Sequence, residues 1–279
     1  VVILSLSFFD NNQQEKYCRS IIPDREYQTD EDNRRFVFSA QEIKDEEDCL
    51  RFYTAHMEVS VYADDTLIYH VGQQQAMPKV SPGVVWNYVG IPSGAEQIQV
   101  MIRAVYPEVR QKQIDFSIGG YTQMYNGMLY RSMPVTFIFL LEILLGSFMV
   151  LWWLIARTRM QMKQTMLHFG IFSFMTGIWA LNQTDAALLI LFPVRVESVF
   201  VSAIALILMV PSFVWFTKGF FDVEDKWGSD IICTLAYLDL AVQLILQLTG
   251  ICGFRQMYTV THVLLGIALL YTIVMLISE

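Results

Sequence analysis

The stretch PVTFIFLLEILLGSFMVLWWLIA, residues 134–156, decides the fold class of this chain. Its one charged residue is Glu142, and the run is long enough to cross a bilayer, whose hydrocarbon core of ~30 Å needs about 20 apolar residues. The whole sequence is 54% hydrophobic and only 16% charged, which is unlike an average soluble chain. Further apolar runs follow at short intervals, so we expect an α-helical transmembrane bundle over residues 134–279 with five spans, at 134–156, 166–182, 197–217, 231–251 and 257–278.

The basic residues between these spans predict an orientation. Cytoplasmic loops of membrane proteins carry an excess of Lys and Arg. The loops at 157–165 and 218–230 hold five such residues, whereas the loops on the other side hold two, Arg195 and Arg255. We therefore expect a multi-pass protein with residues 10–133 extracytoplasmic and the end of the chain, Glu279, in the cytoplasm.

Residues 1–9 are also largely apolar, but they are too short to span a bilayer. We interpret them as the remnant of an N-terminal signal or anchor helix. The first residue is Val1, as in a mature or truncated chain. Because the sequence stops directly after the last span, we also expect the natural protein to continue beyond it.

Residues 10–133 differ in composition, with 12 Lys or Arg and 18 Asp or Glu. Apolar and polar residues alternate at 57–62 and 97–104, which is the period of a half-buried strand. Asp64 and Asp65 separate the first of these runs from a second β-rich run, so a hairpin is expected there. We predict that 10–133 is a jelly-roll-like β-sandwich sensor domain, with strands near 35–40, 49–55, 57–62, 66–71, 84–91, 97–104 and 114–119.

Several classes of function are disfavoured by the same sequence. The net charge of −8 and the lack of a basic stretch argue against a nucleic-acid partner. The four histidines are widely separated and no familiar catalytic motif occurs, so we expect no metal, no cofactor and no enzyme activity in this chain. Cys18 and Cys49 both lie in the outer part, and their spacing leaves a disulfide and two separate thiols as open alternatives.

Four segments of the chain form an ordered set, namely VSVYADDTLIY at 59–69, SPGVVWNY at 81–88, IRAVYP at 102–107 and GIWALN at 177–182. Together they resemble the sensory region of bacterial membrane-bound diguanylate cyclases, which is similar to the seven-transmembrane receptors with diverse intracellular signalling modules. The resemblance implies an outer β-sandwich, seven spans in the bacterial inner membrane and a cytoplasmic GGDEF output domain that makes cyclic di-GMP as a homodimer. This chain departs from that pattern, because it has five apolar runs and no GGDEF sequence.

A first group of residues is a candidate ligand site in the outer domain. Aromatic faces beside hydrogen-bond donors suit sugars and other small polar molecules. The alternative is that Trp86 belongs to the core and that the Ser81-Pro82-Gly83 segment is a structural turn. The candidates are His56, Trp86, Asn87, Arg103 and Tyr106.

A second group is a candidate relay within the membrane. Asp239, Gln243 and Gln247 are spaced by four residues, so they share one helix face, and polar groups in hydrocarbon normally point into the bundle. The alternative is that these side chains only hold helices together through hydrogen bonds. The remaining candidates are Glu142 in the first span, Trp179 and Asn182 at the end of the second, and Glu197 at the start of the third.

These observations lead to one preferred function and one alternative. We expect the sensory part of a signal-transduction receptor, in which an unknown small-molecule ligand, for example a carbohydrate, acts on the β domain and the signal reaches the bilayer-embedded helices. The alternative is a transporter or channel with an extracytoplasmic lid, for which internal repeats and broken helices would be typical.

Overall fold

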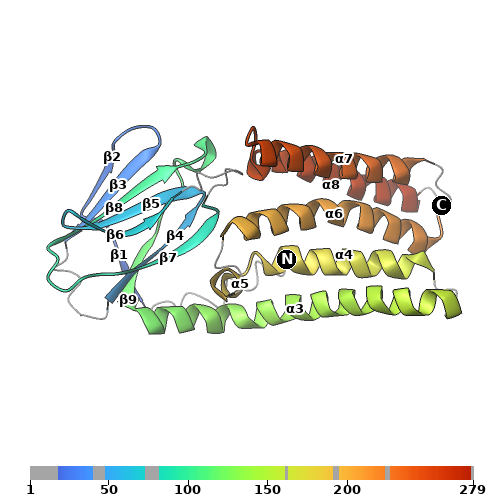
Figure 1. The fold of residues 1–279 in the computed structure, drawn as a ribbon, viewed down its shortest axis with the longest axis horizontal. Coiled ribbons are helices and arrows are strands. Elements are labelled where there is room, and N and C mark those ends of the chain that lie inside the picture. The colour runs from blue at the N-terminus through green and yellow to red at the C-terminus, as the bar shows by residue number, and fades with distance from the viewer. Residues whose placement is uncertain are drawn as a thin grey trace. The chain divides into compact units, whose positions relative to one another are not determined.

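The computed structural model describes residues 18–39, 48–72, 82–160, 163–190, 195–223 and 227–277. The chain divides into two compact units, one ending at Ser132 and the other beginning at Met133. The described part of the first unit is built from two antiparallel sheets and the first turns of a long helix, and the second unit is helical (Figure 1). The predicted fold class, a β-sandwich followed by a helical bundle, is confirmed. Residues 1–9, interpreted above as a signal or anchor remnant, lie outside the described residues.

The first unit holds nine described strands in two sheets. One sheet has the order β1-β9-β4-β7, which we call sheet A, and the other has the order β2-β3-β8-β5-β6, which we call sheet B. The strands are β1 (Arg19–Ile21), β2 (Arg25–Gln28), β3 (Asn33–Ser39), β4 (Asp48–Ala55), β5 (Met57–Ala63), β6 (Thr66–Val71), β7 (Val84–Gly90), β8 (Gln97–Ala104) and β9 (Phe116–Gly120).

The core of the sandwich forms where the inner faces of the two sheets meet. In β5 every second residue is buried, because successive side chains of a strand point to opposite faces. Phe116 of sheet A stands at the centre of an aromatic cluster, with ring centroids 5.1 Å from Phe36, 5.0 Å from Phe38 and 5.1 Å from Phe52. Such aromatic pairs stabilise a core beyond the apolar area they bury.

The hairpin expected at Asp64 is present between β5 and β6. Asp64 has φ +51°, a left-handed conformation that Asp tolerates better than most residues. Its carboxylate also accepts the backbone N–H groups of Glu96 and Gln97 at 3.1 and 3.0 Å, so the turn is tied to the start of β8. Strands β1 and β2 were not expected from the sequence.

The second unit is built from helices that continue from the first. Helix α3 begins at Tyr121, directly after β9, and includes the boundary between the units. A short helix, α5, was not predicted. The helices are α3 (Tyr121–Met160), α4 (Gln164–Leu181), α5 (Asp185–Ile190), α6 (Arg195–Phe221), α7 (Gly228–Thr249) and α8 (Phe254–Ile277).

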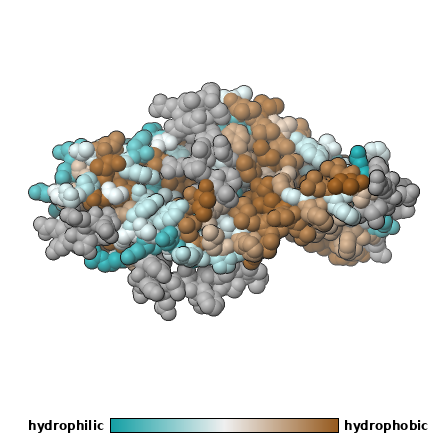
Figure 2. Space-filling view, turned by 60° about the horizontal axis from the view of Figure 1, so that its bottom comes forward, coloured by the Kyte–Doolittle hydropathy of each residue, from teal (hydrophilic) through white to brown (hydrophobic). Residues whose placement is uncertain are grey.

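Four of these helices are long and apolar enough to cross a membrane by length and composition, namely α3, α6, α7 and α8. Hydrophobic surface, brown in Figure 2, gathers over the helical unit. The predicted span at 166–182 coincides with α4, which contains the polar residues Gln164 and His168 and is not one of the four. That α4 also crosses the bilayer stays a prediction, as does the orientation of the chain.

Close helix packing in the second unit depends on small residues. At Gly146 of α3 a Cβ atom would lie 2.5 Å from the backbone nitrogen of Phe174 in α4, so only glycine fits this crossing. Helices α6, α7 and α8 share a separate core that includes Val214, Ala236 and Ala268. Helix α7 ends at Thr249 and is capped by Gly250, whose φ of +71° is the left-handed conformation that favours glycine.

Candidate functional site

The outer face of sheet A carries a buried cation. Leu50 and Phe52 of β4 point into the sandwich core, so Arg51 between them points to the opposite face. Its side chain is nevertheless only 6% exposed. One guanidinium nitrogen donates to the Cys18 thiol sulfur at 3.2 Å and to the Ser117 hydroxyl at 3.5 Å, and the buried Nε makes no hydrogen bond.

Arg51 is unlike the arginines of the unit that form ion pairs. Arg34 pairs with Glu26 at 2.6 Å, Arg110 with Asp32 at 2.6 Å, and the exposed Arg103 with Glu58 at 3.7 Å. Within the described ranges no carboxylate lies at ion-pair distance from Arg51. A buried charge normally has a partner of opposite sign, so this guanidinium is a favourable place for an anionic group.

Aromatic side chains surround this guanidinium. The Arg51 Cζ atom lies 5.3 Å from the centre of the Trp86 ring, a cation–π distance, and Trp86 contacts Tyr53 edge to face at 5.1 Å. The register of β4 and β7 pairs Arg51 with Tyr88 and Tyr53 with Trp86. These four side chains therefore form one patch on the outer face of sheet A, which we call the Arg51 patch.

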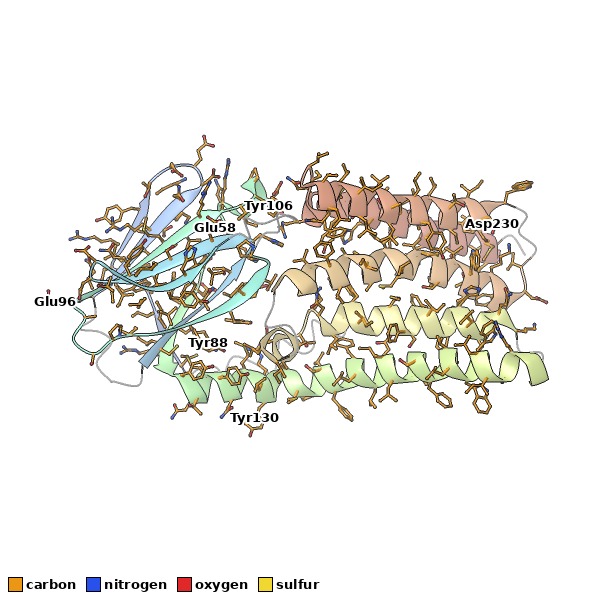
Figure 3. All side chains as sticks on the ribbon, viewed as in Figure 1. Glu58, Tyr88, Glu96, Tyr106, Tyr130 and Asp230 are labelled. Carbon is orange, nitrogen blue, oxygen red and sulfur yellow. The ribbon has the colours of Figure 1, made fainter. Side chains whose placement is uncertain are left out.

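The first turns of α3 contact this patch through Tyr88. Its ring packs edge to face against Tyr121 at 5.5 Å and Tyr125 at 6.2 Å, and its hydroxyl donates to the sulfur of Met128 at 3.5 Å. Figure 3 shows Tyr88 beside the beginning of α3. The patch is thus in contact with the helix that follows β9 in the chain.

The predicted outer ligand set is not one cluster. Trp86 and Asn87 are neighbours in β7 and therefore point to opposite faces of sheet A. Asn87 is fully buried, accepts from the Tyr69 hydroxyl at 3.0 Å and donates to the Thr54 hydroxyl at 2.9 Å. Because Tyr69 belongs to sheet B, Asn87 links the two sheets and has a structural role.

His56 and Tyr106 do come together, with ring centroids 5.5 Å apart. His56 is buried, has φ +57°, and its backbone N–H donates to the Gly83 carbonyl at 2.6 Å. This pair lies where β4 turns into β5, and Figure 3 labels Tyr106 next to the short 3-10 helix Pro107–Val109. Arg103 is exposed and paired with Glu58, and no described contact joins it to the other predicted residues.

Cys18 and Cys49 are not joined by a disulfide in the structure. Cys49 in β4 pairs with Gly119 of β9, and the residue after Cys18 begins β1, which lies on the other side of β9. The two cysteines are therefore two strand spacings apart, which places their Cα atoms at roughly 10 Å from each other. A disulfide needs Cα atoms within ~7 Å.

The predicted polar residues at the end of the second span are joined to α6. Asn182 donates to the Ser198 backbone carbonyl at 2.9 Å and accepts from the Ser198 hydroxyl at 2.9 Å. Gln183 adds a contact with the Ser202 hydroxyl at 3.4 Å. Trp179 is half-buried one turn earlier. The side chain of Glu197 lies outside the described residues.

Glu142 of α3 is half-buried, and its side chain makes no hydrogen bond or ion pair in the ranges that the structure describes. Its backbone carbonyl accepts from the Ser173 hydroxyl at 3.5 Å, close to the crossing of α3 and α4. The structure therefore places this carboxyl in the apolar unit without assigning it a partner.

The face predicted for Asp239, Gln243 and Gln247 is present on α7. Gln243 is 1% exposed and donates to both Asp239 carboxylate oxygens at 2.9 Å and to the Thr261 hydroxyl of α8 at 2.7 Å. The Thr261 hydroxyl donates to Asp239 at 3.0 Å. Gln247, also buried, accepts the backbone N–H of Phe254 at 2.8 Å and so satisfies the first turn of α8.

Sequence reasoning missed Arg51 and Thr261. Arg51 stands in the run Cys49-Leu50-Arg51-Phe52, where a charged residue within a predicted strand was the available signal. Thr261 has no such signal, because only the packing of α8 against α7 brings it to Asp239. A comparison of the chain with models of known protein families and with curated protein sequences finds no match.

Proposed function

We propose that this chain is the sensory and transmembrane region of a bacterial signal-transduction receptor. It detects an extracytoplasmic small molecule with the β-sandwich and passes the signal through α3 to the helical unit. The chain has a lipid bilayer as its environment and carries no enzymatic step of its own.

One observation supports this proposal more than any other. Strand β9 ends at Gly120 and α3 begins at Tyr121 with no linker, and α3 continues for 40 residues through the first apolar run. A helix of this length extends for about 60 Å. Tyr88 of the Arg51 patch contacts the first turns of that helix. A displacement of the patch by a ligand would therefore act on α3, as in hinge or shear transitions.

The chemistry of the Arg51 patch favours a particular ligand class. A buried guanidinium with no carboxylate at ion-pair distance among the described residues suits an anionic group, and the partly buried Trp86 and Tyr53 rings suit the apolar face of a sugar. An acidic carbohydrate combines both features. We therefore propose a small acidic sugar as the ligand.

The direct test is thermal unfolding of the full chain in lipid nanodiscs with matched sugars, for example galacturonate and galactose. Saturating acidic sugar is expected to raise the midpoint of the β unit, because a ligand that binds only the folded state stabilises it. The shift should be lost in Arg51→Met and kept in Arg103→Met, a matched change of an exposed arginine. An identical response of both variants, or none from any acidic sugar, would reject this ligand site.

The output that we propose for the whole protein is a cytoplasmic diguanylate cyclase, which works as a homodimer. This follows from the resemblance of the four sequence segments described above. Cyclic di-GMP in cells that express the full-length protein, measured with and without the ligand, tests it. Unchanged cyclic di-GMP with a demonstrably bound ligand would reject the cyclase output.

The alternative function, a transporter or channel with an extracytoplasmic lid, is supported by a single observation. The hydrogen-bonded group of Asp239, Gln243 and Thr261 lies inside apolar helices, where transporters often bind their substrates. Solute flux in proteoliposomes that disappears in Asp239→Asn would favour this function over the receptor.

A further inference from the structure

The aromatic pair of the Arg51 patch is in contact with a second cation. The ammonium nitrogen of Lys112 lies 5.1 Å from the centre of the Tyr53 ring, which is a cation–π distance. Tyr53 contacts Trp86 edge to face at 5.1 Å, and the Arg51 guanidinium lies 5.3 Å from the centre of the Trp86 ring. Two rings therefore stand between two positive charges, and each ring contacts one of them.

The strand register places the two cations at opposite ends of this row. Strands β4 and β9 are antiparallel, and Arg51 pairs with Ser117. The residues that precede Ser117 in the chain therefore lie beside the later residues of β4, where Tyr53 stands. Lys112 comes shortly before β9, so it approaches Tyr53 from the side away from Arg51. Because Tyr53 is itself displaced from Arg51 by about 7 Å along the strand, a ligand with a single carboxylate can meet only one of the two cations.

The main chain at Lys112 is held by hydrogen bonds on both sides. Its backbone N–H donates to the Val109 carbonyl at 3.2 Å, and its carbonyl accepts from the Arg34 guanidinium of β3 at 2.8 Å. The Lys112 side chain is exposed, and no carboxylate among the described residues lies at ion-pair distance from it. The carboxylate closest to it in sequence, Asp115, accepts from the Gln113 amide at 3.2 Å. Lys112 thus offers a second positive charge on a fixed backbone.

We propose that the ligand of the Arg51 patch is a short acidic oligosaccharide that carries at least two carboxylates. This inference rests on the proposed acidic-sugar ligand and makes it more specific. One carboxylate binds to the Arg51 guanidinium, and a second lies at the Lys112 ammonium. The sugar rings between them pack on Trp86 and Tyr53, which are both half-buried and so keep part of their rings accessible. Lys112 is therefore a specificity-determining residue, which favours a fragment of an acidic polysaccharide over a single acidic sugar.

The unequal burial of the two cations predicts unequal contributions to binding. Arg51 is 6% exposed, so a carboxylate that reaches it forms a charge-assisted contact away from water. Lys112 is exposed, and water screens its charge. We therefore expect Arg51 to determine whether acidic sugars bind at all. Lys112 should make longer acidic sugars bind about threefold to tenfold more tightly, because its contact becomes intramolecular once the first carboxylate is bound.

The test is isothermal titration calorimetry of the full chain in nanodiscs of uncharged lipid. Galacturonate is compared with its linear dimer, trimer and tetramer, and each affinity is expressed per carboxylate to remove the statistical gain. In the wild type this affinity should rise about threefold to tenfold between galacturonate and the trimer and then level off. Two further probes are the neutral galactose trimer and adipate, a dicarboxylate without a sugar ring. Both should bind no more tightly than galacturonate.

Lys112→Met should remove the gain with ligand length and leave the affinity for galacturonate unchanged. Lys112→Arg is the matched control, because it keeps the positive charge, and it should retain the gain. Asp115→Asn removes an exposed carboxylate from the same segment and should not weaken binding of the trimer. Both substituted positions are exposed, so the unfolding midpoint without sugar should stay close to that of the wild type.

The possible results separate this inference from the function on which it rests. Galacturonate that binds, with no gain in affinity per carboxylate up to the tetramer, overturns the second contact and leaves the Arg51 ligand site in place. A gain that persists in Lys112→Met also overturns it, as does adipate that binds as tightly as the trimer. If neither galacturonate nor its oligomers bind the wild type, the inference and the Arg51 ligand site both fail. The wild-type series alone decides if a variant does not fold.

Discussion

The guanidinium of Arg51 lies over the Trp86 ring, 5.3 Å from its centre, although Arg51 is almost fully buried and Trp86 faces the outer side of sheet A. This relationship places a positive charge in an aromatic setting next to the start of α3. Arg51 and Trp86 are therefore the two residues on which the sensory hypothesis can be tested. Asn87, the next residue after Trp86 in β7, points to the opposite face of sheet A and does not belong to this patch.

Replacing Arg51 with Met should leave the fold intact. The change removes a cation–π contact worth about 2 kcal/mol when desolvated, and it also removes the cost of burying a charge that has no ion pair within the described residues. We therefore expect the free energy of unfolding to change by less than about 2 kcal/mol, measured by urea denaturation of the full chain followed by tryptophan fluorescence. A loss well above this value would assign Arg51 a structural role and weaken the ligand site.

Replacing Asn87 with Leu should destabilise the sandwich much more. The substitution removes the buried amide that accepts from the Tyr69 hydroxyl and donates to the Thr54 hydroxyl. We expect a loss of about 2–4 kcal/mol in the free energy of unfolding by the same measurement, because buried polar groups without partners are costly. Tyr69→Phe is the control and removes the hydrogen bond from the Tyr69 hydroxyl to Asn87 while keeping the amide, so it should cost about 1 kcal/mol. Equal and small effects of both changes would contradict the structural role of Asn87.

The crossing of α3 and α4 predicts a steric effect. Gly146→Ala would bring a Cβ atom within 2.5 Å of the Phe174 backbone nitrogen, which cannot move without shifting α4. A destabilisation of about 1–3 kcal/mol is expected from such overpacking. Gly266→Ala in α8 is the matched control, since no atom lies within 4 Å of its added Cβ, and it should be neutral or slightly stabilising. Equal thermal stability of the two variants would mean that α3 and α4 do not cross at Gly146.

The turn at Asp30 predicts a dependence on pH. Hydrogen bonds from the Asn33 side chain and from the backbone N–H groups of Asp32 and Asn33 lower the pKa of Asp30. A lowered pKa in the folded state stabilises the fold above the unfolded pKa of about 3.9, and this contribution is lost as the pH falls through the folded value. The difference in unfolding midpoint between the wild type and Asp30→Ala should therefore be constant from about pH 5 to 8 and shrink below about pH 4.

Glu108→Ala serves as the control for this prediction, because Glu108 is exposed and outside the turn. Its difference from the wild type should not follow the same curve. A difference for Asp30→Ala that stays constant down to pH 2 would contradict the role of the Asp30 carboxylate.

Elements with a long apolar run or a clear alternation of apolar and polar residues could be predicted from the sequence, whereas short exposed strands could not. The apolar runs were sufficient to place α3, α6, α7 and α8, since hydrocarbon thickness sets their length. Alternation revealed β5 and β8. Strands β1 and β2 escaped because they are short and largely exposed, so they carry no buried face to detect.

The candidate functional residues were predicted less completely than the fold, because some of them meet only through contacts between segments that are distant in sequence. The four-residue spacing of Asp239 and Gln243 was sufficient to predict that they share one helix face, on which they form a hydrogen bond. Thr261 comes from another helix and depends on packing. The strand period alone could have separated Trp86 from Asn87, because adjacent residues of a strand cannot share a face. Arg51 required the structure, since its burial depends on residues distant in sequence, Cys18 and Ser117.

Hydrogen–deuterium exchange of the full chain in nanodiscs, with and without the acidic sugar, tests the central claim most directly. The claim is that a ligand at the Arg51 patch acts on α3. We expect ligand binding to change the exchange of residues 121–132, where Tyr88 contacts the helix, in the wild type and not in Arg51→Met. A ligand that demonstrably binds the wild type but leaves the exchange of residues 121–132 unchanged would contradict the account.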